Sequence, residues 1–336
     1  MNRHKKESVL QISDNHGSTK IQNLLNALTG AMENGTCKVG DSLPSVNELS
    51  RISGYSRDTV VKAYRLLQER SLIESIPAKG FFVTGKSRRV FMLLDDFSAF
   101  KEQLYQAFRS NIPKTWTVDL LFHHYNEKIF EQLVLSAAGR YSVYIIMNIS
   151  NRSLHPALSK IPANRLLILD MGTPGPPEVS YLLQNFDGAV TKSLESSLPL
   201  LRKYQEFIMV YSHRKTPHPA ETVQAVKDFC DKNGFGFSLQ AETNSGSIKK
   251  GQIYLVIKEN DLVDVVKACR ELQLQPGDDI GILAYNDTPM KEIAVDGITT
   301  ISVNFKEMGI KAAAFAANGE KIQEILPTSL RIRNSL

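Results

Sequence analysis

The hydrophobic pattern of this chain changes at Arg88, and that change constrains the fold more than any other feature of the sequence. Before it, apolar residues recur every three or four positions in short segments, as in amphipathic helices. After it, strand-like apolar runs alternate with helical patterns, which is typical of parallel sheets built from βαβ units. We therefore predict an α/β protein with a small N-terminal domain over residues 1–84, a linker over 85–89 and a larger domain over 90–336.

The N-terminal segment shows three helical patterns followed by a hairpin pattern. The first covers residues 18–34, with Ser18 as its predicted N-cap. The second and third begin after Ser45 and Ser56, because a serine hydroxyl can accept a hydrogen bond from the first turn of a helix. The two strands of the hairpin are predicted over residues 72–76 and 81–84. We interpret this hairpin as a wing beside the three helices.

The larger segment contains more strand patterns than one sheet holds. Strands are predicted over residues 90–94, 117–122, 143–148, 166–170, 188–190, 207–211, 236–239, 253–257, 280–285 and 299–303. A sheet of βαβ units usually has about six strands. We therefore expect two lobes, each with its own parallel sheet.

Charge is distributed unevenly between the two segments. The net charge is +5, but residues 1–89 hold 14 Lys and Arg against 8 Asp and Glu, whereas the rest holds 26 against 27. A short basic segment indicates a polyanionic partner, because phosphates are neutralised locally and release counterions. The alternative is an ordinary solvated basic surface, and charge alone does not decide between them.

Several classes of protein are disfavoured by composition. Apolar runs such as residues 144–147 and 166–169 are far shorter than the roughly 20 residues of a membrane span, and residues 1–10 lack the apolar core of a signal peptide. We therefore expect a cytoplasmic protein with no membrane partner. Cys37, Cys230 and Cys269 are widely spaced, so we expect no disulfide framework, no metal site and no cofactor.

An ordered set of residues spans most of the N-terminal segment. It consists of Gly40, Asp41, Leu43, Pro44, Ser45, Glu48, Leu49, Ser50, Gly54, Ser56, Arg57, Thr59, Val60, Ala63, Leu66, Leu72, Ile73, Gly80, Phe82 and Val83. This set resembles the winged helix-turn-helix of the GntR family of bacterial regulators. The resemblance implies double-stranded DNA as a partner. Val46 and Asn47 stand where the family commonly has a Glu-Arg pair.

The start of the third helix carries the best candidates for base contacts. A guanidinium there can form a bidentate pair with guanine in the major groove, and Asp58 can orient Arg57 or accept from cytosine. Ser45 can contact a phosphate, although serine is also a common N-cap in any protein. The predicted DNA-binding residues are Ser45, Ser56, Arg57, Asp58, Thr59, Val61, Lys62, Lys79 and Gly80.

A second ordered set lies in the last third of the chain. It consists of Asp278, Asp279, Ile280, Gly281, Ile282, Tyr285, Asn286, Asp287, Gly297, Ile298, Thr299, Thr300, Ile301, Met308, Gly309, Ala312, Leu330, Arg331 and Ser335. This set resembles the effector domain of LacI-type repressors, which is similar to periplasmic sugar-binding proteins. The resemblance implies a two-lobed, periplasmic-binding-protein-like domain with a cleft for a small polar effector such as a pentose or deoxyhexose.

Polar residues at the carboxyl ends of the predicted strands are the candidates for this cleft, because open α/β sheets bind ligands there. The predicted effector-binding residues are Asp95, Asp96, Phe97, His123, Asn148, Asn260, Asp261, Asn286 and Asp287. Asn and Asp are also common turn residues, which is the alternative reading of each. Sugar-responsive relatives usually carry an arginine where residues 219–227 have none, so Arg214, His218 and Glu221 are candidate replacements.

These observations favour a sugar-responsive transcriptional repressor that acts as a homodimer on a near-palindromic operator. A body that binds a non-sugar metabolite is one alternative. A catalytic body is another, but only 247 residues follow Arg89, and they contain no glycine-rich phosphate-binding motif, which disfavours the aminotransferase found in some GntR-type proteins. Neighbouring His123 and His124 point to opposite sides of a strand and make a poor metal chelate. We therefore predict no enzymatic activity.

Overall fold

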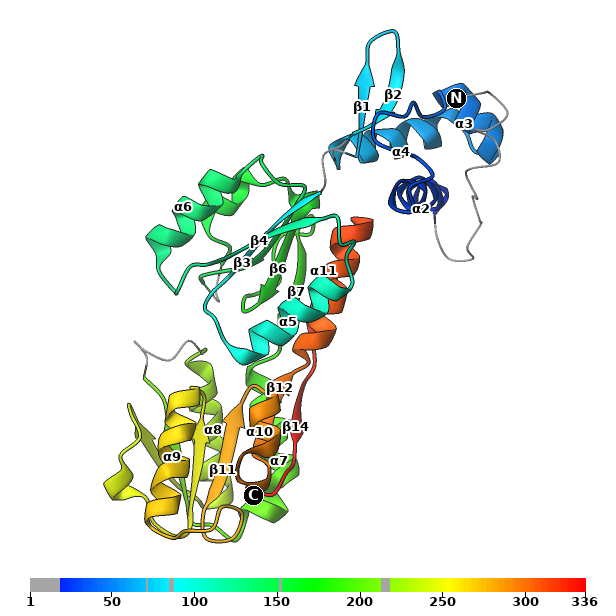
Figure 1. The fold of residues 1–336 in the computed structure, drawn as a ribbon. Coiled ribbons are helices and arrows are strands. Elements are labelled where there is room, and N and C mark those ends of the chain that lie inside the picture. The colour runs from blue at the N-terminus through cyan, green and yellow to red at the C-terminus, as the bar shows by residue number, and fades with distance from the viewer. Residues whose placement is uncertain (1–18, 71, 85–87, 151–152, 213–217) are drawn as a thin grey trace.

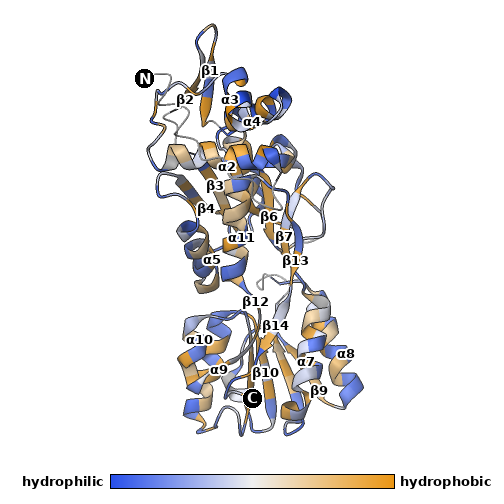
Figure 2. Ribbon diagram, turned by 90° about the vertical axis from the view of Figure 1, so that its right-hand side faces the viewer, coloured by the Kyte–Doolittle hydropathy of each residue, from blue (hydrophilic) through white to orange (hydrophobic). Residues whose placement is uncertain are grey.

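Three structural units follow one another along an elongated molecule in the computed structural model of the chain (Figure 1, Figure 2). The structure describes residues 19–70, 72–84, 88–150, 153–212 and 218–336. The first unit, residues 19–84, is called the head. The other two units are the first and second lobes of the body, and the first lobe lies between the head and the second lobe.

The head contains three helices and a two-stranded antiparallel hairpin. The elements are α2 (Lys20–Glu33), α3 (Val46–Ser53), α4 (Arg57–Glu69), β1 (Ile73–Ile76) and β2 (Gly80–Val83). Leu24, Leu49, Val60 and Leu67 are fully buried between the helices. The predicted winged helix-turn-helix is therefore confirmed. Thr19, not Ser18, caps α2 by accepting from Gln22 N, and Ser18 lies outside the described residues.

The turn between α3 and α4 is fixed by local hydrogen bonds. Ser45 and Glu48 form a capping box at the start of α3, in which each side chain accepts from the backbone N–H of the other. Gly54 ends α3 with a φ of 71°, a left-handed conformation that glycine adopts without strain. Ser56 then caps α4 by accepting from Thr59 N. These caps set the angle at which α4 leaves the turn.

The first lobe contains a six-stranded sheet in the order β13-β7-β6-β5-β3-β4, and all its strand pairs are parallel. Its strands are β3 (Arg89–Leu94), β4 (Thr117–Phe122), β5 (Val143–Met147), β6 (Leu166–Asp170), β7 (Ser180–Gln184) and β13 (Gln323–Leu326). One face is covered by α5 (Ala99–Ser110) and α11 (Phe305–Asn318), and the other by α6 (Glu127–Ala137), η1 (Pro156–Lys160) and η2 (Ala163–Arg165).

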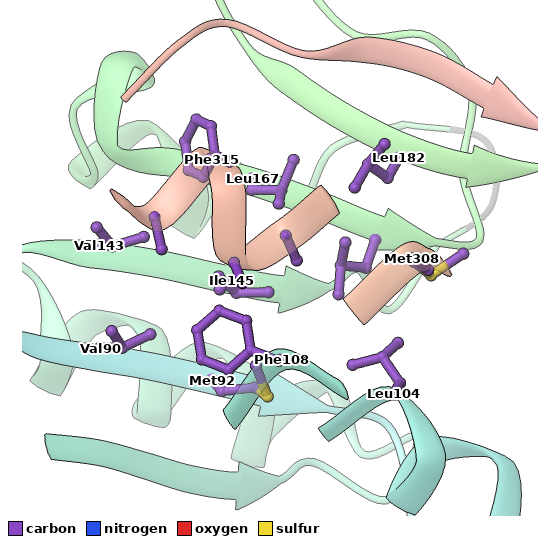
Figure 3. Packing of buried hydrophobic residues seen from close by; sticks show 14 of the residues in the cluster. Val90, Met92, Leu104, Phe108, Val143, Ile145, Leu167, Leu182, Met308 and Phe315 are labelled. Carbon is purple, nitrogen blue, oxygen red and sulfur yellow. The ribbon is translucent and has the colours of Figure 1, made fainter. Parts of the chain in front are cut away.

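Alternate residues of each strand face opposite helical layers. Val90 and Met92 pack against α5 and α11, as Figure 3 shows, whereas Phe91 and Leu93 pack against α6. Burial of one such side chain contributes about 1.5–3 kcal/mol. Both faces of the sheet are therefore apolar, which explains the continuous apolar runs in the sequence.

The second lobe contains a six-stranded sheet in the order β14-β12-β11-β10-β8-β9, parallel except for the pairing of β14 with β12. Its strands are β8 (Glu206–Val210), β9 (Gly236–Gln240), β10 (Gln252–Val256), β11 (Gly281–Tyr285), β12 (Thr299–Val303) and β14 (Thr328–Arg331). Its helical segments are α7 (Asp187–Leu201), α8 (Glu221–Asn233), α9 (Glu259–Glu271), α10 (Pro289–Ile293), η3 (Ser245–Ser247) and η4 (Ala294–Asp296). The predicted pair of lobes is confirmed.

The chain passes between the two lobes three times, near residues 185–186, at Asn304 and near residue 327. Helix α7 follows a strand of the first lobe but packs in the second, whereas α11 follows a strand of the second lobe and packs in the first. Each lobe is therefore built from separate segments of the chain.

Some predicted elements differ from the structure. The strand predicted over residues 188–190 is wrong, because these residues lie in α7, and the strand before that helix is β7. Strands β13 and β14 were not predicted, since each has only four residues and lies at the edge of a sheet. Arg89 begins β3, and Arg88 is 1% exposed, while residues 85–87 of the predicted linker lie outside the described residues.

No helix within the described part of the chain is both long and apolar enough to cross a membrane.

Candidate functional site

Helix α4 presents a polar face to solvent at the end of the molecule. Arg57, Asp58 and Lys62 are exposed, and Val61 is 50% exposed although it is apolar. Arg57 is the first residue of the helix. Among the described residues no ion pair joins Asp58 to Arg57, so the structure gives no support to the idea that Asp58 orients this arginine. The helix therefore offers a guanidinium, an ammonium and a methyl-bearing surface to a partner.

The hydroxyls of Ser45 and Ser56 act as helix caps, and both residues are exposed. A hydroxyl that accepts from a backbone N–H still has its own proton to donate. Ser56 Oγ lies 2.8 Å from Thr59 Oγ1, so one of these two hydroxyls donates to the other. The capping and phosphate-contact interpretations of these serines are therefore compatible.

The hairpin tip also extends into solvent. Lys79 and Gly80 are both exposed, and Gly80 has a φ of 101°, which favours glycine at this position. Lys79 N donates to Ile76 O at 3.0 Å, which closes the turn. The hairpin thus supplies a second cationic point on the head.

A cavity of about 310 Å³ lies between the two lobes, where the carboxyl ends of both sheets meet. It is called the cleft. Its lining residues are Asp95, Asp96, Phe97, Ser98, Phe100, Lys101, Tyr125, Asp170, Met171, Gln184, Phe186, His218, Ile257, Lys258, Glu259, Asn260, Tyr285 and Asn286. Its size and its mixture of aromatic and polar groups suit a small polar molecule.

A buried ionic cluster forms the first-lobe wall of the cleft. Lys101 pairs with both Asp95 and Asp96, and Tyr125 Oη donates to Asp95 Oδ2 at 2.7 Å. Burial lowers the pKa of Lys101, but Asp95 and Asp96 outweigh that effect and raise it overall. Burial, followed by Asp95, raises the pKa of the Tyr125 phenol. Lys101 is therefore charged and Tyr125 is neutral at physiological pH.

Asp170 and His218 are the other buried titratable groups of the cleft. Asp170 ends β6 and accepts from Gln184 Nε2. Burial, reinforced by Asp95, raises the pKa of Asp170 to about 7. Burial lowers the pKa of His218 to about 3, so its ring is neutral, and its Nε2 lies 3.0 Å from Thr222 Oγ1.

Three buried polar atoms in the cleft have no hydrogen-bond partner within the described residues. They are Ser98 Oγ, Gln184 Oε1 and Asn286 Oδ1. A buried polar group without a partner costs about 1–3 kcal/mol. A ligand that donates hydrogen bonds to these atoms would remove this cost.

The structure brings five of the nine predicted effector-binding residues together in the cleft. They are Asp95, Asp96, Phe97, Asn260 and Asn286. It does not bring His123, Asn148, Asp261 or Asp287 to the cleft lining.

His123 and Asn148 are used inside the first lobe instead. His123 is fully buried, with Nε2 3.2 Å from Met147 O and Nδ1 accepting from Tyr125 N. Asn148 organises the loop after β5 by donating to Ser150 O and Ser153 O. Both side chains satisfy backbone groups, which explains why they turn away from the cleft.

Asp261 and Asp287 lie in the second lobe. Asp261 is 5% exposed on α9, with Oδ2 3.5 Å from Lys258 Nζ. Asp287 accepts from Arg331 and Arg333, and although burial raises its pKa, these arginines and Thr300 lower it overall. Asp287 therefore anchors the C-terminal segment to β12 and its neighbours.

Sequence reasoning missed most of the remaining lining residues. Lys101 and Tyr125 follow predicted strand ends by several positions, and Gln184 was missed because the strand it ends was misplaced. Among the three candidate replacements for an arginine, His218 lines the cleft, Glu221 does not, and Arg214 lies outside the described residues.

Three arginines, called the arginine clasp, lie at the junction of the head and the body, and two of them, Arg70 and Arg165, bond across it. Arg70 donates to Ala317 O and Asn318 O, and Arg88 donates to Ala316 O at 2.7 Å, so both cap the C-terminus of α11. Arg165 of the first lobe donates to Glu69 O at 2.5 Å and so caps the C-terminus of α4. Each helix end carries a partial negative charge, which an arginine complements.

Helices α5 and α11 connect the cleft to the arginine clasp. Phe100 of the cleft packs on Phe305, the first residue of α11, with ring centroids 4.7 Å apart. Gly309 lets the two helices approach closely, since a Cβ there would overlap Leu104 O and lie 3.0 Å from Phe108 N. Packed helices therefore form a continuous connection from the cleft to the end of α4.

Two family models match separate parts of the chain. Residues 20–83 match bacterial regulatory proteins of the gntR family, and residues 201–336 match the periplasmic binding protein-like domain. These ranges correspond to the head and to most of the second lobe together with the C-terminal elements of the first.

Among curated proteins, similarity covers less than a third of the chain. The chain is 35% identical over 68 residues to the HTH-type regulator YcxD of Bacillus subtilis, and 40% identical over 68 residues to YjiR of Escherichia coli. These regions cover 20% of the chain in each case, and only 15% and 14% of the two relatives. The transcriptional repressor YtrA of Bacillus subtilis is 28% identical over 98 residues, which cover 29% of the chain and 75% of YtrA.

Among solved structures, similarity covers about three quarters of the chain. A LacI family regulator from Lactobacillus casei with bound sucrose has a TM-score of 0.60 at 16% identity, over 74% of the chain and all of that structure. The trehalose repressor of Escherichia coli has a TM-score of 0.61 at 12% identity, over 73% of the chain and all of that structure. At these identities the likeness concerns the fold. The chain therefore combines a GntR-type winged helix-turn-helix head with a two-lobed body of the periplasmic-binding-protein fold.

Proposed function

We propose that this protein is a transcriptional repressor that binds double-stranded DNA through its head and a small polar effector, such as a monosaccharide, through its cleft. One observation carries the proposal: the chain joins an exposed cationic helix to a cavity with unsatisfied polar atoms by a continuous packed connection. A binding protein needs both sites, and regulation needs the connection between them.

The head supplies groups suited to the major groove. Arg57 at the start of α4 can bind guanine, Val61 can contact a thymine methyl group, and Lys62 can contact a phosphate. Ser45 and Ser56 are placed at helix starts, where hydroxyls and N–H groups favour phosphates. The wing, through Lys79 and Gly80, adds a contact beside the groove.

The cleft supplies groups suited to hydroxyls. Its carboxylates, amides and aromatic rings offer acceptors, donors and flat surfaces. LacI family regulators of similar fold have been solved with sucrose, glucose and lactose bound. These neighbours support a sugar-like effector, and the protein acts by binding it, not by converting it.

Effector binding changes the separation of the lobes and moves α5 and α11, and the arginine clasp passes that movement to α4. We expect a coupling of about 1–3 kcal/mol between the two sites, which is about 5- to 150-fold in operator affinity. The active form is a cytoplasmic homodimer on a near-palindromic operator, with half-sites about 34 Å or a multiple of this distance apart.

The test is a fluorescence anisotropy titration of the protein with fragments of its own promoter region. Arg57→Ala is expected to weaken specific binding by about 1–3 kcal/mol, or about 5- to 150-fold. Arg202→Ala, the same change at an exposed position of the second lobe, is the matched control. Equal affinity of wild type and Arg57→Ala for the specific fragment would refute the proposal.

A further inference from the structure

The first-lobe wall of the cleft has an excess of negative charge. Asp95, Asp96 and Asp170 line this wall, and Lys101 is the cation among its described lining residues. The second-lobe wall is balanced, because Lys258 and Glu259 both line it, and Glu259 also pairs with Lys291 at 2.9 Å. One ammonium therefore faces three carboxyl groups on a single wall.

This excess is buried. Asp95 is 2% exposed, Lys101 is 3% exposed and Asp170 is 5% exposed. An uncompensated buried charge costs several kcal/mol, so a group of this kind binds a proton or a cation. In the free protein Asp170 is the group that can bind this proton, because burial, reinforced by Asp95, raises its pKa to about 7.

A buried acceptor on the same wall has no partner. Gln184 is 6% exposed and lines the cleft, and its Nε2 donates to Asp170. That hydrogen bond fixes the amide orientation and leaves Oε1 as an acceptor with no partner among the described residues. Asn286 Oδ1 is a second such acceptor, on the opposite wall. An ammonium carries three donors and no acceptor, so it matches these groups better than a hydroxyl does.

Aromatic rings around the cluster already face a cation. Lys101 Nζ lies 5.1 Å from the ring centroid of Phe100 and 5.9 Å from that of Tyr125. Such rings attract ammonium groups. A metal ion is a poorer candidate, because no group of three or more His, Cys, Asp or Glu side chains among the described residues is arranged to hold one.

We propose that the effector is a hydroxylated primary amine of the amino-sugar class, whose ammonium binds at Asp95, Asp170 and Gln184 and whose hydroxyls reach Asn286. The proposal rests on the function proposed above, since it concerns the same cleft. A neutral sugar would satisfy Gln184 and Asn286 but would leave the excess charge, and an anion would be repelled by it.

Binding of the amine displaces the proton of Asp170, so affinity rises with pH. The charged or titratable groups that face Asp170 are Asp95, Asp96 and Lys101, with Tyr125 and neutral His218 also on the cleft lining. Below pH 7 the ammonium competes with the proton, and above pH 7 it does not. For an amine that stays protonated, affinity is expected to increase about tenfold between pH 6 and pH 8.

The test uses matched pairs of probes in isothermal titrations in amine-free phosphate buffer at pH 7. The pairs are glucosamine with glucose, galactosamine with galactose, and 1-amino-1-deoxysorbitol with sorbitol. We expect the amine of at least one pair to bind ten times more tightly or better than its neutral partner. For 1-amino-1-deoxysorbitol, the titrations are repeated at pH 6 and pH 8.

Two substitutions test whether the carboxylates of the first-lobe wall cause the preference for the amine. Asp170→Asn is expected to remove most of the preference for the amine. Asp96→Asn, at a more exposed carboxylate of the same wall, is expected to reduce it, while exposed Asp231→Asn leaves it unchanged. Retention of the tertiary fold is checked by near-ultraviolet circular dichroism. Neutral partners that bind as tightly as the amines, no binding by any amine, or an unchanged preference in both variants would overturn the proposal.

Operator binding is measured in parallel with the same preparations. If the protein binds its operator but prefers neutral sugars, only the amine proposal is refuted. If the protein binds amines but no promoter fragment, only the function proposed above is refuted.

Discussion

The head and the cleft achieve recognition in opposite ways. The candidate contacts of the head are exposed and come from one helix, two helix caps and one hairpin tip. Those of the cleft are mostly buried and come from strand ends in both lobes. The candidate contacts of the head therefore lie close together in the sequence. Those of the cleft are far apart in the sequence and come together only because the two sheets fold.

The two regions also differ in electrostatics. Arg57 and Lys62 stay in water until a partner arrives, so their charges cost the free protein little. Asp95, Lys101 and Asp170 lose water when the protein folds, and burial and neighbouring charges raise or lower the pKa values of Lys101 and Asp170. Substitutions of Arg57 and Lys62 should therefore change binding alone, whereas those of the buried charges in the cleft should change stability as well.

The largest expected effect tests the packing of the body. Gly309→Ala places a methyl group against Leu104 O and Phe108 N, which are backbone atoms and cannot move aside easily. We expect a loss of about 3 kcal/mol in unfolding free energy, measured by urea denaturation. Gly30→Ala in α2 is the control, because nothing lies within 4 Å of its Cβ position, and alanine favours a helix by up to about 1 kcal/mol. Equal changes in unfolding free energy for the two substitutions would contradict the expected cost of crowding between α5 and α11.

The second effect concerns the pH dependence of stability. Because folding raises the pKa of Asp170 to about 7, the folded state binds the proton more tightly, and this contribution is lost as pH rises towards 7. Asp170→Asn is expected to raise stability more at pH 8 than at pH 5, by about 2–3 kcal/mol relative to wild type. Thermal unfolding at several pH values measures this difference. The same substitution at Asp58, exposed on the head, is the comparison, and a pH-independent effect of Asp170→Asn would contradict the expectation.

The third effect concerns the energetic coupling between the head and the cleft. Arg70→Ala removes the hydrogen bonds from the end of α4 to the end of α11. Operator affinity without effector is expected to change little, but the response to effector should fall by about 1–2 kcal/mol. Anisotropy titrations with and without effector measure this coupling. Arg65→Ala, an exposed change on the same helix, should keep the full response. An undiminished response in Arg70→Ala would exclude the bonds of Arg70 to α11 as the connection.

The smallest effect sharpens the role of one cleft residue. Asn286 has a φ of 61°, so Asn286→Gly removes the amide without straining the backbone. Effector affinity is expected to fall by about 1–2 kcal/mol, while operator affinity without effector stays the same. Calorimetry and anisotropy measure the two quantities. A variant that binds effector as tightly as wild type would place the ligand elsewhere in the cleft.

The sequence predicted the exposed residues of the head better than the lining of the cleft. The exposure of Arg57, Val61 and Lys62 is decided by one helical period and one cap, so a linear pattern predicts it. His123 could not be predicted in this way. His124 and Tyr125 have φ values of 49° and 56°, and this left-handed turn brings Tyr125, and not His123, into the cleft.

Gln184 illustrates a different limit. Its strand, β7, has the sequence Ser-Tyr-Leu-Leu-Gln. The strand was predicted instead at the apolar residues 188–190, which lie in α7. The edge partner of β7 is β13, which lies more than 130 residues later in the chain. Pairing over such a separation leaves no local pattern. The topology of the lobes therefore had to come from the structure.

The three passages between the lobes have a consequence for synthesis of the protein. The head is complete once residue 84 has been made, whereas the first lobe lacks α11 and β13 until residue 326. Domains fold as they emerge from the ribosome, the N-terminal ones first. Every nascent chain thus carries a complete head well before the first lobe is complete, and a product that stops short of Phe305 would have the head without α11, the helix that connects it to the cleft.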